Sequence, residues 1–202
     1  LYQPEKGEIL KDGKVVKINS PNDATALGIG MVHQHFKLVE CFSVLDNIIL
    51  GAEDTVLGFT QKKKAKQKVL ALSEKYGFNI DLKARIDEIT VGMQQRTEIL
   101  KMLYRDNEIL IFDESTSMLD PEGRREIMDV ARKLNDSGIT VITITHNMDE
   151  AAMADRIIVL KKGRVALDGT PKEVFAHYQE LEKIGLAAPQ VTYIMHDLKE
   201  KG

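Results

Sequence analysis

The sequence predicts an α/β fold, in which helices flank a parallel sheet. Short apolar runs alternate with segments of helical periodicity, as in Glu108–Asp113, Pro121–Asn135 and Ile139–Ile144. The first of these runs has almost no polar interruption, which indicates a strand buried on both faces. The 202 residues are 43% hydrophobic and 29% charged, which is typical of one globular domain with a sizeable core.

Composition and charge exclude several kinds of protein. The net charge of −3 gives no electrostatic case for binding nucleic acid. The single cysteine, Cys41, excludes an internal disulfide framework and fits a reducing compartment. No apolar run approaches the roughly 20 residues that span a bilayer. The chain begins with Leu1 and not Met, so we expect its natural start to lie upstream, and a targeting segment there stays open.

The first forty residues predict a hairpin, a short helix and a strand. Gly7–Val16 holds an Asp-Gly turn between apolar stretches. Pro21 opens a helix that Gly28 closes. The strand Ile29–Val32 then runs into the polar cluster His33–His35. Ligands of open α/β sheets lie at the carboxyl ends of strands, so this cluster is a candidate site, and a polar surface turn is the alternative.

Residues 41–107 are predicted to be mostly helical. Ser43 caps a stretch that ends at Leu50, Thr60–Tyr76 forms an amphipathic helix with a lysine-rich front, and another helix runs from Met93 to Tyr104. Alanines and leucines at helical spacing behind the lysines favour a solvated face over a phosphate patch. The region is interpreted as a helical insertion between strands of the sheet.

Two acidic residues, Asp113 and Glu114, end the apolar strand and concentrate the chemistry. A carboxylate in an apolar wall is unfavourable unless a cation or a reacting water meets it. One acid on Mg²⁺ and the next on a water is what nucleotide hydrolysis needs. The alternative is a strand that simply ends at an acidic turn.

The last part of the chain alternates helices and strands. A helix is predicted over Pro121–Asn135, then a strand over Ile139–Ile144 that ends in Thr145-His146-Asn147, and then a helix over Met148–Ala154. Two strands follow, over Arg156–Leu160 and Arg164–Leu167. Thr170 opens a further helix with a capping box, and a helical tail runs from Tyr178 with a break at Ala188-Pro189.

Together these motifs resemble the ATP-binding subunits of ABC transporters. The matching residues are Gln34 for the Q-loop, Ile89–Met93 with Gln94-Gln95-Arg96 for the signature motif, Ile109–Glu114 for Walker B and the catalytic glutamate, Ser117–Asp120 for the D-loop, and His146 for the switch histidine. Order and approximate spacing are those of the family. The resemblance covers essentially the whole chain.

The resemblance implies one ABC ATPase domain over residues 1–202, with a RecA-like P-loop NTPase core that is truncated at its start. Residues 1–40 and 108–170 would form the core, 41–107 the helical subdomain and 171–202 the C-terminal helices. No Gly-x-x-x-x-Gly-Lys-Ser/Thr loop, which wraps the phosphates in this family, occurs in the sequence. We therefore expect a fragment that begins after the P-loop helix, and a naturally degenerate subunit is the alternative.

The resemblance also assigns roles with ATP and Mg²⁺ as cofactors. Asp113 and Gln34 would hold Mg²⁺, Glu114 would activate water as the general base, and His146 would stabilise charge on the γ-phosphate. The nucleotide-binding residues would be Gln34, Asp113, Thr90, Gly92, Met93, Gln94 and Asp120. Of these, Thr90 and Gly92 would serve the partner's ATP through the positive end of their helix, and Asp120 would reach across the same interface.

The chain departs from the family pattern at several positions. Val91 replaces the first Gly of the signature and Met93 replaces its Gln. A β-branched residue at a usual Gly narrows the approach of the backbone to phosphate. Ser115 stands where Pro is usual, with little effect expected. His33 and His35 are interpreted as lining the Q-loop surface, and metal ligation is the alternative.

The function implied is that of the ATP-binding subunit of an ABC importer, which hydrolyses ATP in a head-to-tail homo- or heterodimer beneath a membrane permease. The protein would lie peripherally on the cytoplasmic face of the cell membrane, and Gln34–Phe42 with the helical insertion would dock the permease. A non-transport ABC ATPase would need coiled-coil arms or tandem domains. A catalytically inert fragment or interaction subunit stays open, and we expect these 202 residues alone to be inactive.

Two lineages are mixed in the sequence. Residues up to about Glu114 resemble the ATPases of sugar and nucleoside importers. From Ser115 onward, the chain resembles the ATPases of energy-coupling factor transporters for vitamins and metal ions. An unusual lineage and a mosaic both stay open, and so does the transported substrate.

Overall fold

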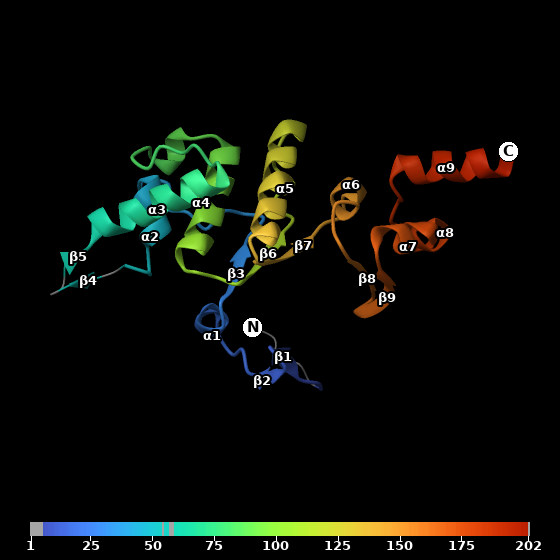
Figure 1. The fold of residues 1–202 in the computed structure, drawn as a ribbon, viewed down its shortest axis with the longest axis horizontal. Coiled ribbons are helices and arrows are strands. Elements are labelled where there is room, and N and C mark those ends of the chain that lie inside the picture. The colour runs from blue at the N-terminus through green and yellow to red at the C-terminus, as the bar shows by residue number, and fades with distance from the viewer. Residues whose placement is uncertain (1–5, 54, 57–58, 202) are drawn as a thin grey trace. The chain divides into compact units, whose positions relative to one another are not determined.

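The computed structural model describes residues 6–53, 55–56 and 59–201. They divide into two compact units, residues 1–142 and 143–202, and Figure 1 shows the helices and strands of each. The first unit holds the sheet, the helical insertion and most of the predicted site. The second unit begins at Thr143, within the strand that precedes His146.

The chain opens with the predicted hairpin and short helix. Strands β1 (Ile9–Lys11) and β2 (Lys14–Val16) pair antiparallel. Asp12 and Gly13 between them have φ angles of 52° and 73°, which is the conformation of a tight hairpin turn. Helix α1 (Pro21–Ala26) follows, and Gly28 leaves it with a φ of 70°. These local predictions are confirmed.

A three-stranded sheet with the order β3-β6-β7 lies at the centre of the first unit. Strands β3 (Ile29–Val32) and β6 (Ile109–Asp113) are parallel, and β7 spans Thr140–Ile144. In β6, Leu110 and Phe112 are fully buried but their neighbours are only partly so. The prediction that both faces of this strand are buried is therefore wrong. Its side chains alternate between fully buried and partly buried positions, so only one face of the strand is completely covered.

The helical region shares one core with the sheet. It contains α2 (Val44–Ile49), α3 (Lys62–Tyr76), the 3₁₀ turn η1 (Ile86–Glu88) and α4 (Val91–Tyr104), and α5 (Pro121–Asp136) follows strand β6. Helix α4 packs against α2, α3 and β3 (Figure 1). The core residues that join these elements include Val32, Ile48, Val69, Leu100, Phe112 and Leu134. The lysines at the front of α3 are exposed, which confirms the solvated face.

Two short strands in this region were not predicted. Strands β4 (Thr55–Val56) and β5 (Phe59–Thr60) pair antiparallel. Each has only two residues, which is too short for a sequence alternation to indicate a strand. Helix α3 begins two residues later than predicted and α4 two residues earlier.

The second unit has its own small core. Helix α6 (Met148–Ala151) precedes the antiparallel strands β8 (Ile157–Lys161) and β9 (Arg164–Gly169), and α7 (Pro171–Ala176), α8 (Tyr178–Lys183) and α9 (Gln190–Lys201) follow. Val159, Val174, Phe175 and Leu181 form the core. The predicted capping box is present, since Thr170 and Glu173 bond each other's backbone amides. Helix α6 is shorter than predicted.

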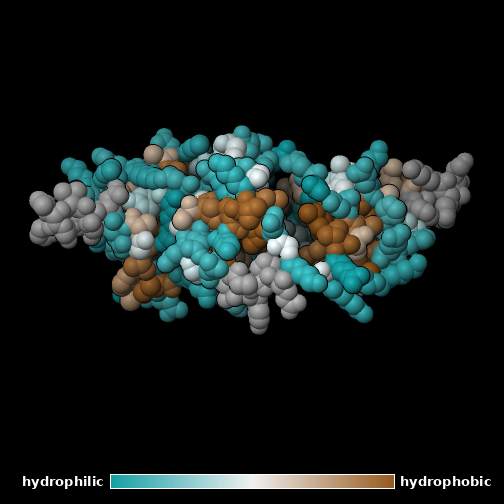
Figure 2. Space-filling model, turned by 90° about the horizontal axis from the view of Figure 1, so that it is seen from below, coloured by the Kyte–Doolittle hydropathy of each residue, from teal (hydrophilic) through white to brown (hydrophobic). Residues whose placement is uncertain are grey.

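Hydrophobic surface remains exposed, and Figure 2 shows separate hydrophobic patches on the side that it draws. The large exposed hydrophobic residues include Ile9, Leu10, Val15, Phe42, Ile142, Ile144, Ile158, Leu160, Val165, Val191, Ile194 and Leu198. In the part of the chain that the structure describes, no helix has the length and apolar character to cross a membrane.

Candidate functional site

The pairing of β3 with β6 positions the first part of the site. Val32 lies opposite Phe112, so both strands end at the same edge of the sheet. Beyond this edge, Gln34 Nε2 donates a hydrogen bond to Glu114 Oε2 at 3.3 Å. The two residues are 80 positions apart, so the register of the strands brings them together. The polar residues that follow β3 and those that follow β6 therefore lie together at one edge of the sheet.

Glu114 has an unusual backbone. Its φ of 43° lies in the left-handed region, which costs an L-residue other than glycine about 1–2 kcal/mol. Such strained residues persist where their surroundings fix them, and they cluster at active sites. The Ser117 amide donates to the Glu114 carbonyl at 3.0 Å, and Ser115 and Thr116 between them are buried. The turn therefore holds the Glu114 carboxylate just past the end of β6.

The donors at this edge suit one kind of metal site. Asp113 and Gln34 carry the oxygen atoms that Mg²⁺ prefers. Among the described residues, no group of three His, Cys, Asp or Glu side chains is placed to hold a metal ion. In nucleotide sites Mg²⁺ is held by one or two carboxylates together with the phosphates of the substrate. One carboxylate and one amide fit that arrangement and do not fit a cage built from protein alone.

The signature residues form the start of α4. Thr90 is the N-cap residue, and its hydroxyl accepts a hydrogen bond from the Met93 amide at 3.3 Å. Val91 is 40% exposed. A Cβ added to Gly92 would meet nothing within 4 Å among the described residues. The first turn of α4 therefore offers its positive end to an approaching anion without obstruction from its own side chains.

Gln94 is placed differently from its neighbours. Its Nε2 donates to the carbonyl of Ile86 at 3.1 Å and to that of Ile89 at 3.4 Å. These bonds fix η1 and the approach of the chain to α4. The amide group is thus engaged within its own chain.

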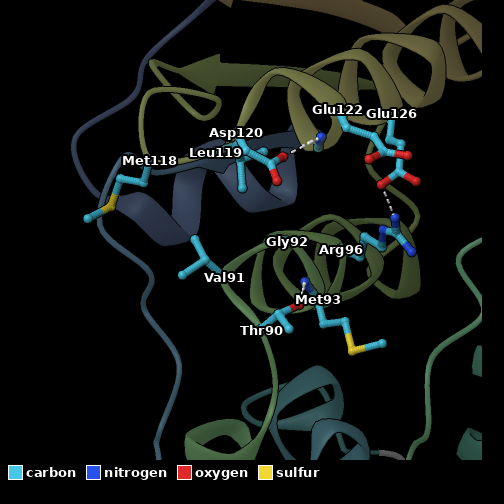
Figure 3. A pocket seen from close by; sticks show the side chains of 11 residues that line it. Thr90, Val91, Gly92, Met93, Arg96, Met118, Leu119, Asp120, Glu122 and Glu126 are labelled. Atoms are coloured by element: carbon cyan, nitrogen blue, oxygen red, sulfur yellow. Dashed lines mark hydrogen bonds and ion pairs between the residues drawn. The ribbon is translucent and has the colours of Figure 1, made fainter.

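Four of the predicted residues line one cavity of about 530 Å³, shown in Figure 3. Thr90, Gly92 and Met93 come from the start of α4, and Asp120 is the N-cap of α5, where its Oδ1 accepts from the Gly123 amide at 2.7 Å. The other lining residues are Val91, Arg96, Met118, Leu119, Glu122, Gly123 and Glu126. The structure therefore brings the signature motif and the D-loop together.

The charges around this cavity do not suit a triphosphate. It has three carboxylates, on Asp120, Glu122 and Glu126, against the single guanidinium of Arg96. Arg96 is paired with Glu126, as the dashed line in Figure 3 shows. An anion inside the cavity would meet net negative charge.

His146 lies in the second unit, in the loop between β7 and α6. The hydroxyl of Thr145, just before it, donates to Glu150 Oε2 at 2.7 Å and accepts from the Asn147 amide at 3.0 Å. Glu150 is only 4% exposed. These bonds fix the backbone on both sides of His146.

Sequence reasoning missed three buried polar residues near Gln34. They are Asn47 on α2 and Glu98 and Lys101 on α4. The available signal was weak: Glu98 and Lys101 are two opposite charges, three positions apart, within the apolar run of α4. Such a pair on a helix is usually solvent-exposed.

The comparisons with known proteins agree on one family. The ABC transporter family profile matches residues 1–117. The nucleoside import ATP-binding protein NupA of Lactococcus lactis subsp. cremoris is 50% identical over 165 residues, which are 81% of this chain and 33% of that protein. The energy-coupling factor transporter ATP-binding protein EcfA1 of Caldanaerobacter subterraneus subsp. tengcongensis is 51% identical over 112 residues, which are 55% of this chain and 40% of that protein.

A solved structure shows the same fold. It is cbiO1 of Clostridium perfringens, described as part of the ABC transporter complex cbiONQ, with a TM-score of 0.74 and 30% identity over 96% of this chain and 78% of that one. The predicted RecA-like α/β fold is thereby confirmed, and so is the resemblance to both importer lineages. The chain spans about a third of the length of the nucleoside-import relative.

Proposed function

Because the chain belongs to the ABC transporter family, we propose that it is the ATP-binding part of an ABC importer and hydrolyses ATP to drive uptake through a membrane permease. The observation that carries hydrolysis is the hydrogen bond of 3.3 Å from the Gln34 amide to the Glu114 carboxylate. It joins a γ-phosphate sensor to a general base at the carboxyl edge of a parallel sheet, where such folds bind ligands.

Each residue that we propose for the reaction has one task. Glu114 accepts a proton from the attacking water, and its strained backbone keeps the carboxylate beyond the strand. Asp113 and Gln34 would hold Mg²⁺, which would neutralise charge on the phosphates. His146 donates to the γ-phosphate oxygen on which charge develops.

The second half of the site comes from a partner subunit. The first turn of α4, with Thr90 as its cap and open space at Gly92, receives the phosphates of the partner's ATP. Met93 and Asp120 line the cavity beside that turn and contact the same interface. Gln94 acts through the backbone of η1. This arrangement requires two subunits head to tail.

The permease docks near the segment that follows Gln34. Of the apolar residues there, Leu38 packs against the core of the first unit, whereas Phe42 is 40% exposed. Phe42 is therefore the residue we assign to the permease contact, and we propose that the protein lies at the cytoplasmic face of the membrane. Relatives named for nucleoside and sugar import cover more of the chain than energy-coupling factor relatives do, which favours a nucleoside or sugar as the transported substrate.

The test is Glu114→Gln in the full-length protein. The variant loses the base but keeps one side-chain oxygen and the Mg²⁺ residues, so ATP binding should persist while turnover falls by about 10²–10⁴-fold. Glu108→Gln is the matched control, because Glu108 lies at the other end of the same strand and its side chain is 69% exposed. Near-normal hydrolysis by Glu114→Gln would refute the assignment. A wild-type protein that assembles without turnover would favour the inert subunit.

A further inference from the structure

Two charged side chains of α4 are buried, although the proposed reaction makes no use of them. Glu98 is 1% exposed and Lys101 is 8% exposed. Three positions apart on a helix, they lie on the same face. A buried charge is unfavourable unless it is paired and hydrogen-bonded. These two side chains therefore need partners, and the partners indicate what they do.

Both side chains bind the backbone of one residue, Lys37. The Lys37 amide donates to Glu98 Oε1 at 2.7 Å, and Lys101 Nζ donates to the Lys37 carbonyl at 3.1 Å. Lys37 follows Gln34 by three positions and is itself exposed. Desolvation lowers the pKa of Lys101, and the attraction of Glu98 opposes that effect. The pair thus holds the chain just after the Q-loop.

Asn47 of α2 holds Val39 in the same way. Its Oδ1 accepts from the Val39 amide at 2.7 Å, and its Nδ2 donates to the Val39 carbonyl at 3.0 Å. Asn47 is fully buried. Residues 37 and 39 lie outside the strands and helices, and buried side chains bind the backbone amide and carbonyl of both; the Val39 carbonyl also accepts from the Phe42 amide at 3.1 Å. The segment is fixed from two helices.

We propose that Glu98 and Lys101 are positioning residues that fix Gln34 at Glu114 and tie its position to α4. The inference rests on the proposed function, because it concerns the same site. Thr90 at the start of α4 lies eight residues from Glu98, about 12 Å along a helix axis. A rigid helix of this length passes a displacement of its first turn to Lys37. Binding of phosphate at the start of α4 is thereby sensed at Gln34 of the same subunit.

The test separates positioning from stability with an apolar replacement. Glu98→Leu with Lys101→Met removes both buried charges but keeps the volume, and such replacements are often neutral or stabilising for the fold. In the full-length protein we expect kcat to fall about 10-fold or more, with the melting temperature unchanged or raised. Glu98→Gln keeps an oxygen that accepts from the Lys37 amide, and should restore most of kcat. Lys66→Met with Glu74→Leu, on the exposed face of α3, is the charge-matched control.

A second measurement needs no ATP. Hydrogen exchange of residues 35–40 in the 202-residue chain should speed up in Glu98→Leu/Lys101→Met and not in the control. Unchanged exchange would overturn the proposal, and so would a kcat equal to that of the control. If the double variant does not fold, kcat and the hydrogen exchange of residues 35–40 are measured in Lys101→Met alone, and the same outcomes decide. A wild-type protein without ATPase activity but with the exchange effect would reject the proposed function and leave the attachment of Lys37 to α4 standing.

Discussion

The left-handed backbone of Glu114 leads to a prediction about stability that is independent of nucleotide. At a φ of 43°, a side chain with a Cβ is strained by about 1–2 kcal/mol and glycine is not. Glycine also lowers the free energy of unfolding by about 0.4–1 kcal/mol relative to alanine, because its unfolded chain is more flexible. Glu114→Gly should therefore be about 1 kcal/mol more stable than Glu114→Ala. Comparing these two variants isolates the backbone, because both lack the carboxylate.

Urea unfolding followed by circular dichroism measures this difference as a shift in midpoint at constant slope. For a chain of this size it corresponds to roughly 2–4 °C in Tm. Glu108 supplies the control, because it is not among the residues with positive φ. There the order should reverse, with Gly less stable than Ala by about 0.5–1 kcal/mol. A glycine variant at position 114 that is no more stable than the alanine variant would refute the strained turn.

Three further predictions concern the rest of the first unit and the chain as a whole. Gly30→Ala should lower the free energy of unfolding by about 1–3 kcal/mol, because its Cβ would lie 2.5 Å from Asn107 Nδ2. Gly92→Ala, where the Cβ would meet open space, should not lower it, and equal urea midpoints for the two variants would contradict this prediction. The hydrogen bond from Lys62 lowers the pKa of Asp46 below its ordinary 3.8, so this group stabilises the fold above that pH. The advantage over Asp46→Asn is lost as the pH falls below 3.8 and through the lowered pKa, and a difference independent of pH would contradict it. The 202 residues contain no Gly-x-x-x-x-Gly-Lys-Ser/Thr loop, so calorimetry should find weak Mg-ATP binding, and micromolar affinity would show that another loop does this work.

Local signals predicted the parts of the fold that local chemistry determines. The Asp12-Gly13 turn, Gly28 after α1 and the Thr170 capping box are positions where one residue type satisfies a backbone requirement. The proximity of Gln34 and Glu114 was also predictable, because carboxyl ends of parallel strands meet at one edge. These inferences need no knowledge of distant contacts beyond the sheet itself.

The start of α4 was harder to predict. The sequence predicted a helix from about Met93, and Val91 and Gly92 just before it are poor helix formers. The Thr90 cap and the packing of the helix against the core outweigh this preference. Local propensity is a weak guide where a cap and tertiary packing both favour the helix.

The partners of Glu98 and Lys101 could not be predicted from any local pattern. Lys37 lies 61 positions from Glu98 and 64 from Lys101. The contact depends on how α4 lies beside the segment after β3, and no residue of that segment signals it. Buried charges on a helix are recognised only once the helix has been placed.

The register of β3 against β6 also limits which changes in length the chain tolerates. Gln34 and Glu114 each lie two positions beyond the paired residues Val32 and Phe112. If one residue is inserted into β3 while its start stays paired, His33 comes to the place opposite Glu114, and a deletion brings His35 there. Either change puts an imidazole where an amide now lies, although every site residue is still present. We therefore expect insertions and deletions between Gly28 and Gln34 to be rejected even where substitutions are accepted.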